Sequence, residues 1–449
     1  MAVDRTSPAG SDLQWRFVWT RSVERFRATS FDARTQEFRH LVRRSREVVL
    51  LAAVTGALTG LLVRFFEYVV TEVMLERVLE APLWFGAIAP GIGLVLAAIC
   101  LHTFGGRASS ATSDEYLRAF HDPEYPIRPR AFVGRIMAAV VTLGFGGPMG
   151  LEGPSMYGGS ALGAMIQRRL PAAFKGADHR TLLVAGAAAG VSAIFKAPAT
   201  GAIFALEVPF RDQMARRMLV PALVASASGY LVFAALSSTS PIFVFDDNRR
   251  AQFAYKDLLG AVLVGIACAV GARGFAYLIR RAKASTVRPI AVRVPIAAAV
   301  SIVLFVITRL LTGESLTLGN YPTIAWLGKD NAIWLLAAVF AIRCVATATI
   351  TAGGGVGGLF IPLVVGGALV GRAVGDIVNP SDPTLYVILG MAAFLGAGYR
   401  VPLAAVVFVA ETTGQPGFIV PALFAAVAAE LVMGEQSITP YQRRSEREE

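Results

Sequence analysis

The fold of this chain is decided by the stretch Gly147-Pro148-Met149-Gly150-Leu151-Glu152-Gly153-Pro154-Ser155-Met156-Tyr157-Gly158-Gly159, because its pattern recurs 208 residues later. The second copy reads Gly355-Val356-Gly357-Gly358-Leu359-Phe360-Ile361-Pro362-Leu363-Val364-Val365-Gly366-Gly367, and glycine, leucine or proline recurs at six matching positions. A repeat over so long a distance indicates two structural copies within one chain.

A second pair of blocks agrees at a shift of 204 residues. The block Phe195-Lys196-Ala197-Pro198 matches Tyr399-Arg400-Val401-Pro402, and further on Phe204 meets Phe408 and Glu207 meets Glu411. We therefore expect two related halves, 48–237 and 256–434. An odd number of membrane crossings in each half would invert one half relative to the other.

The composition favours a membrane protein. Of 449 residues, 55% are hydrophobic and only 16% are charged, whereas soluble domains have about 25% charged residues. The uncharged runs 81–106, 218–245 and 344–371 are long enough to cross a bilayer. The alternation typical of a membrane barrel is missing, so we predict helices. Shorter runs, such as 196–207 and 401–411, predict the broken helices of transporter folds.

The charges suggest how the chain is oriented. Residues 1–47 contain ten arginines and six acidic residues, which predicts a cytoplasmic segment by the positive-inside rule. A nucleic-acid-binding arm is the alternative, but the membrane domain already explains the basic run. No apolar signal-peptide region precedes residue 48. We expect a solvent loop at 238–255 and a short cytoplasmic tail at 435–449.

The reactive residue types form no catalytic or metal-binding pattern. The three cysteines (Cys100, Cys268 and Cys344) are far apart within apolar runs, and the four histidines are scattered. We predict small core cysteines, no metal site, no cofactor and no enzymatic activity.

The two glycine-rich blocks have a design that suits an anion. Glycines let the backbone approach a ligand closely, and Pro154 and Pro362 mark the first turn of a helix. The free N–H groups at such a helix start carry partial positive charge and bind anions. Two symmetric helix starts that meet near the middle of the membrane would form an anion site.

These residues resemble the CLC family of chloride channels and chloride/proton antiporters. Gly150-Leu151-Glu152-Gly153-Pro154 is similar to one family signature, and Gly358-Leu359-Phe360-Ile361-Pro362 is similar to its partner. Ala197-Pro198, with Phe204 and Glu207, resembles a third block. The resemblance covers residues 48–434. It implies a CLC fold, a homodimer with one anion pathway in each subunit, and a multi-pass protein of the bacterial plasma membrane with both termini cytoplasmic.

The resemblance also implies roles for particular residues. Glu152 is expected to be the gating glutamate, whose carboxylate competes with chloride; a structural helix cap is the alternative. The backbone N–H groups of Leu359 and Phe360 are expected to face the central ion. The full set of expected anion contacts is Ser109, Gly150, Leu151, Gly153, Gly358, Leu359, Phe360, Thr439 and Tyr441, with Pro154, Pro362 and Glu207 as structural residues.

Two of these assignments depart from the family pattern. Residues 108–112 replace the family's serine loop, with Ser109 as the candidate contact and Ser110 next to it, which leaves anion selectivity open. Near the C-terminus the family has a coordinating tyrosine. A phenol is a good single donor, which favours Tyr441, whereas spacing favours Thr439.

Val208 bears on the transport mode. Exchangers of the family carry a second, proton-relaying glutamate just after the position of Glu207, and here that position is Val208. Because valine cannot carry a proton, we predict a chloride channel, with a chloride/proton antiporter as the alternative. A cation transporter is more remote, because the central blocks offer chiefly Glu152, Glu207 and Glu411 as acids.

Lys196 is a candidate pore charge. The family usually has a basic residue just before the gating glutamate, and here that position is Leu151. A lysine within an apolar run costs about 2.5–3.5 kcal/mol on insertion scales unless it finds a partner or water. Lys196 could replace the missing charge, or its side chain could simply reach a membrane interface. Arg400 is its partner in the repeat.

Overall fold

A computed structural model describes residues 46–125, 127–170, 178–237, 255–380, 382–414 and 416–445. Residues 52–449 form one compact unit. The predicted cytoplasmic segment 1–47 lies outside the described residues up to residue 45. The predicted loop 238–255 lies outside them up to residue 254.

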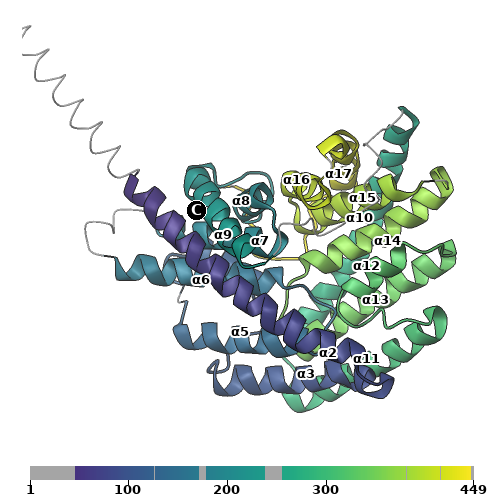
Figure 1. The fold of residues 1–449 in the computed structure, drawn as a ribbon, viewed down its shortest axis with the longest axis horizontal. Helices are drawn as coiled ribbons and strands as arrows, with labels where there is room; N and C mark the ends of the chain where they lie inside the picture. Colours follow the sequence, from purple (N-terminus) through teal and green to yellow (C-terminus); the bar gives the residue numbers. More distant parts are fainter. Residues whose placement is uncertain are drawn as a thin grey trace, which may run out of the picture. The chain divides into compact units, whose positions relative to one another are not determined.

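The described chain is helical, as predicted (Figure 1). The first half contains η1 (Val69–Leu75), α2 (Glu76–Glu80), α3 (Leu83–Thr103), α4 (Ser113–His121), α5 (Pro129–Gly144), α6 (Glu152–Arg169), α7 (Arg180–Phe195), α8 (Pro198–Glu207), η3 (Arg216–Met218) and α9 (Leu219–Ala235). The second half contains α10 (Tyr255–Ser285), α11 (Ile290–Thr312), α12 (Tyr321–Leu327), α13 (Ile333–Gly353), α14 (Phe360–Val378), α15 (Thr384–Tyr399), α16 (Pro402–Thr413), η4 (Pro416–Phe418) and α17 (Ile419–Met433).

Seven helices in the described residues are long and apolar enough to cross a membrane. They are Arg46–Glu80, Leu83–Thr103, Arg216–Ala235, Tyr255–Ser285, Ile290–Thr312, Ile333–Gly353 and Phe360–Val378. One of the runs predicted to cross the membrane does not form a single helix. The run 344–371 is divided between α13 and α14, because its glycine-rich segment 354–359 forms a loop rather than a helix.

The two halves use the same local signals to start and stop their helices. Proline is the first residue of both α8 and α16, where its missing N–H costs no helical hydrogen bond. The preceding helices, α7 and α15, both end at a residue in the left-handed conformation, Lys196 (φ 51°) and Arg400 (φ 56°). The helices that follow, α8 and α16, are shorter than a full span, as the runs 196–207 and 401–411 predicted.

Glycines allow α6 to pack closely on α7, and α14 on α15. A Cβ atom added at Gly159 would collide with the backbone of Gly186, and one added at Gly367 would collide with the backbone of Gly390. Gly159 and Gly367 are partners in the repeat, as are Gly186 and Gly390. Small residues at such crossings let membrane helices approach closely. Figure 1 shows α7, α8 and α9 beside one another and α15, α16 and α17 grouped together.

Two glutamates join the halves by capping each other's helices. Glu207, at the end of α8, accepts hydrogen bonds from the backbone N–H groups of Leu403 (3.2 Å) and Ala404 (2.8 Å) at the start of α16. Glu411, in α16, accepts from the N–H groups of Ala199 (2.9 Å) and Thr200 (2.7 Å) at the start of α8. The exchange is reciprocal, so a local two-fold axis relates the helices. The two hydrogen bonds that Glu207 accepts are the contacts on which its predicted structural role depends.

The C-terminal segment packs into the membrane domain. In the predicted tail, Ile438, Thr439 and Gln442 are buried. The Gln442 side-chain amide donates to the carbonyl of Val208 (2.9 Å) and to that of Tyr399 (2.7 Å). Residues 437–443 thus bridge the ends of α8 and α15.

Candidate anion-binding site

The two glycine-rich loops meet at their matching glycines. The Gly150 N–H donates to the Gly358 carbonyl (2.9 Å), and the Gly358 N–H donates to the Gly150 carbonyl (2.7 Å). Because these residues are partners in the repeat, the reciprocal pair lies on a local two-fold axis. It brings the first turns of α6 and α14 side by side, as the sequence predicted.

Glu152 occupies the start of α14. It is the first residue of α6 and is 2% exposed. Its Oε1 atom accepts a hydrogen bond from the Phe360 N–H at 2.7 Å. Within the described residues, its buried Oε2 atom has no hydrogen-bond partner. A negative group therefore already sits where the helix start attracts anions.

The space for this carboxylate depends on two glycines. A Cβ atom at Gly150 or at Gly358 would overlap the oxygens of Glu152. The loop before Glu152 is held from the second half, because the Asn320 side-chain amide donates to the Met149 carbonyl at 2.8 Å. The conformation that presents Glu152 is thus fixed by both halves.

Two cavities reach this site. A small cavity of about 270 Å³ is lined by, among others, Glu67, Leu151, Glu152, Phe195, Lys196 and Tyr321. A large cavity of about 700 Å³ is lined by, among others, Ser109, Thr112, Asp114, Leu359, Tyr399 and Tyr441. Met149 contributes to both walls. The helix starts that hold Glu152 therefore stand between the two cavities.

The large cavity is strongly basic. Asp114 is the acidic residue of its lining, and the basic residues are His102, Arg107, Arg118, Lys283, Arg288 and Arg293. A cavity lined by one sign of charge within low-dielectric walls concentrates ions of the opposite sign. The large cavity is therefore suited to collect anions.

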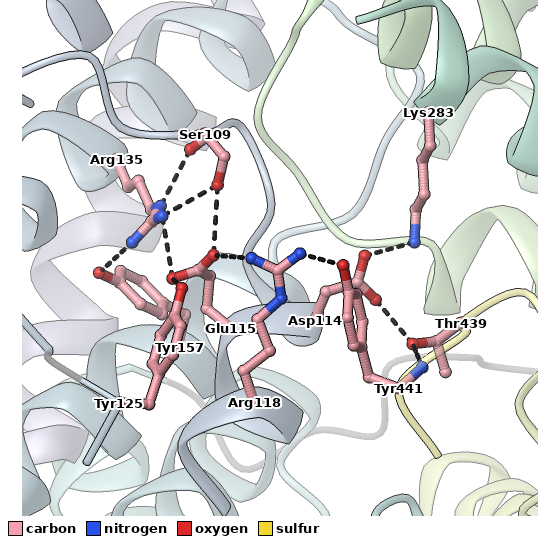
Figure 2. Close-up of polar contacts among 10 residues, drawn as sticks. All are labelled: Ser109, Asp114, Glu115, Arg118, Tyr125, Arg135, Tyr157, Lys283, Thr439 and Tyr441. Carbon is pink, nitrogen blue, oxygen red and sulfur yellow. Dashed lines mark hydrogen bonds and ion pairs between the residues drawn. The ribbon is translucent and has the colours of Figure 1, made fainter. Parts of the chain in front are cut away.

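Figure 2 shows how Ser109 is held on the wall of this cavity. Its hydroxyl donates to Glu115 (3.2 Å) and accepts from Arg135 (3.0 Å). Arg135 also pairs with Glu115 at 2.9 Å and donates to the Tyr157 hydroxyl at 2.9 Å. Ser109 is thus fixed within a buried ion-pair network, and the anion contact predicted for it stays a prediction.

Figure 2 also shows the two C-terminal candidates for an anion contact, Thr439 and Tyr441. Thr439 is buried, and its hydroxyl donates to Asp114 at 2.8 Å. Asp114 also pairs with Lys283 at 2.7 Å. Arg118 donates to the Tyr441 hydroxyl, and its guanidinium lies 4.2 Å from the centre of that ring. Both candidates lie near the cavity, and the choice between them as an anion contact stays a prediction.

Two residues of the large cavity were missed by the sequence analysis. The Thr112 hydroxyl contacts the Gly357 carbonyl at 3.4 Å, beside the start of α14. Tyr399 lines the cavity next to Leu359. The repeat contained a signal for Tyr399, since it replaces Phe195 and adds a hydroxyl, but its spatial neighbours are visible only in the fold.

Lys196 lies in the wall of the small cavity, together with Glu152 and Glu67. Its repeat partner Arg400 has the same backbone conformation but a different environment. Arg400 pairs with Glu430 at 2.8 Å and with Asp212 at 3.3 Å. Lys196 therefore lies next to the predicted gate, and its role there stays a prediction.

The site contains no arrangement that points to a metal. In the part of the chain that the structure describes, no three His, Cys, Asp or Glu side chains gather as a group that could hold a metal ion. The three cysteines are buried and free.

Comparison with known proteins identifies the family. A family model described as voltage-gated chloride channel matches residues 92–434. The chain belongs to the CLC family. It is 27% identical over 421 residues to the H(+)/Cl(-) exchange transporter ClcA of Vibrio parahaemolyticus, covering 86% of each chain. It is 28% identical over 429 residues to the ClcA exchange transporter of Salmonella paratyphi B, covering 89% of this chain and 88% of the other.

The CLC fold is also found in solved structures. A slow cyanobacterial Cl−/H+ antiporter has a TM-score of 0.73 and 22% identity, over 86% of this chain and 94% of the other. A CLC-type fluoride/proton antiporter has a TM-score of 0.75 and 20% identity, over 89% of this chain and 98% of the other. The predicted fold, with its two related halves and broken helices, is confirmed. The chain is a multi-pass membrane protein of an anion-transporting family.

Proposed function

We propose that this protein exchanges chloride, or a similar small anion, for protons across the membrane. The observation that carries the proposal is the buried Glu152 carboxylate, which is bound at the start of α14 between two cavities. Support also comes from the curated relatives described above, which are named as proton/chloride exchangers. The comparisons favour exchange over the uncoupled channel that Val208 predicted.

Glu152 would serve both ions in turn. In its charged form the carboxylate occupies the Phe360 N–H, so an anion cannot bind there. Protonation removes the charge and with it the attraction to the helix start. The neutral side chain can then leave, and an anion from the basic large cavity can bind the freed N–H groups, including those of Leu359 and Phe360. When the side chain loses its proton, the carboxylate is charged again, returns to the helix start and expels the anion.

Val208 supports the alternative, a channel. It is fully buried directly after Glu207, and the Glu207 carboxylate is engaged with the start of α16. Neither residue therefore offers a free proton-accepting group near the end of α8. A proton-coupled mechanism in this chain must accept its proton elsewhere in the site, which makes the transport stoichiometry the decisive measurement.

We further propose a homodimer in a bacterial plasma membrane, with both termini cytoplasmic. Support comes from the family resemblance and from the basic segment 1–47. Light scattering of the purified protein in detergent checks the dimer.

Reconstituted liposomes test the exchange. A chloride gradient should drive protons uphill, in a fixed ratio to chloride, as recorded by chloride and pH electrodes. Glu152→Gln should abolish the proton movement and the pH dependence but leave a chloride flux. Glu435→Gln, which changes an exposed carboxylate, is the matched control and should behave like wild type. Chloride flux without proton movement in the wild type would establish the channel instead, and no anion flux would refute both.

A further inference from the structure

The large cavity ends at a buried phenol. Tyr399 is the last residue of α15, is 3% exposed, and lines the cavity beside Leu359. Its hydroxyl lies close to the Leu359 backbone N–H and to the Ser113 side chain. This hydroxyl therefore stands at the start of α14, between the gate and the basic cavity.

Tyr399 is held in place both at its ring and at its backbone. Phe204 packs edge-on against it, with ring centres 5.6 Å apart and planes at 90°. The Tyr399 carbonyl accepts a hydrogen bond from the Gln442 side chain at 2.7 Å. A donor that is already fixed loses little conformational entropy when it binds a ligand.

We infer that Tyr399 donates a hydrogen bond to the transported anion at the inner end of the large cavity. This inference rests on the proposed function. A phenol oxygen can accept one hydrogen bond while its own proton remains available for an acceptor. The Leu359 N–H and the Ser113 hydroxyl are both donors close to the phenol oxygen, so the phenol proton is left for an anion. Backbone N–H groups and a phenol are neutral donors, which suit a singly charged anion of halide size.

The C-terminal hydroxyls are placed less well for this role. Thr439 already donates its proton to Asp114. Tyr441 lies against Arg118 of α4, whereas Tyr399 lies against Leu359 of the anion-binding helix start. Of these three hydroxyls, that of Tyr399 is therefore the one directed at the proposed binding position.

The repeat supplies a natural reference for this residue. Phe195 has the equivalent position in the first half, lines the small cavity, and packs on Phe360 with ring centres 4.4 Å apart. The second half thus adds a hydroxyl on the side of the large cavity only. Tyr399→Phe would remove this single atom and give both halves the same aromatic ring.

Calorimetric titration of the purified full-length protein with chloride tests the inference. Tyr399→Phe should weaken chloride binding about tenfold, as expected when a hydrogen bond to a charged group is lost. The increase in the thermal unfolding midpoint with added chloride should become smaller than in the wild type. Tyr116→Phe is the matched control. Its buried phenol donates to the Ala205 carbonyl at 2.7 Å, and chloride affinity should stay at the wild-type value.

Several results would overturn the inference. One is an unchanged chloride affinity in Tyr399→Phe. Another is a loss of chloride affinity in Tyr441→Phe but not in Tyr399→Phe. If Tyr399→Phe does not fold, Ser113→Ala provides the second test. It removes a partner of the phenol and should weaken chloride binding about two- to threefold, and an unchanged affinity counts against the inference. A wild-type protein that binds no chloride would refute the proposed function itself, whereas normal exchange with unaffected variants would refute only the role of Tyr399.

Discussion

The two halves of the molecule share a backbone at the places where the chain turns. Gly150 and Gly358 form the same bridge from opposite sides. The helices α7 and α15 both end in a left-handed residue. Glu207 of α8 caps the start of α16, and Glu411 of α16 caps the start of α8. The duplicated elements therefore form a symmetric frame around the proposed binding position.

The halves differ in the side chains that they present to the site. The position of Glu152 in the first half is Phe360 in the second, and the position of Phe195 is Tyr399. One half thus supplies a buried carboxylate, and the other supplies a helix start and a phenol. The residues that the two halves share therefore form the frame, whereas the proposed transport cycle depends on the positions at which the two halves carry different side chains.

Gly358→Ala should have the largest effect, because it disturbs the frame at its centre. The added Cβ would overlap the Glu152 oxygens and approach the Gly153 nitrogen. We expect loss of exchange in liposomes and destabilisation by about 1–3 kcal/mol, the usual cost of overpacking. Gly366→Ala is the control in the same helix, since its Cβ would make only ordinary contacts with Phe340 and Phe394. Equal activity in the two variants would contradict the predicted role of Gly358.

The reciprocal caps should show the symmetry directly. Glu207→Ala and Glu411→Ala each remove the acceptor for two backbone N–H groups. Each should lower the free energy of unfolding by about 0.5–2 kcal/mol, the range for loss of a helix cap. Thermal unfolding in detergent measures this, with Glu435→Ala as a surface control. A large loss in one variant and none in the other would show that the two caps are not equivalent.

Lys196 and Arg400 should give the smallest effects, and they should differ in kind. Lys196→Met should reduce transport about two- to threefold at low chloride, because a nearby positive charge raises the local anion concentration. The deficit should disappear as chloride rises. Arg400→Met should lower the unfolding temperature instead, since Arg400 pairs with Glu430 and Asp212. Transport by Lys196→Met that matches wild type at every chloride concentration would mean that this lysine only ends a helix.

The sequence predicted the parts of the site that depend on local signals. Pro198 and Pro402 predicted helix starts, and the glycine blocks predicted close backbone contacts, because each signal acts within a few residues. The fold confirmed two related halves and placed Glu152 at the start of α14. The helix starts and the glycine turns needed no knowledge of distant contacts.

The remaining parts depend on contacts between residues far apart in the chain. Ser109 was selected from its place in a motif, but its hydroxyl orientation is set by Arg135 and Glu115. The sequence marks Tyr399 only as part of a repeat. Its place in the site could not be predicted, because nothing in the local sequence shows that the end of α15 meets Leu359. The run 344–371 was expected to span the membrane because hydrophobicity alone does not show where glycines interrupt a helix.

The reciprocal caps also determine the order in which the protein can complete its folding during synthesis. The start of α8 is completed by Glu411, which lies 212 residues after Ala199. At the usual rates of translation, this distance takes roughly 10–40 s to synthesise. During that interval the first half carries exposed N–H groups at a helix start that belongs inside the membrane. The two halves therefore depend on each other: a chain cut between them needs both pieces present before either can be completed.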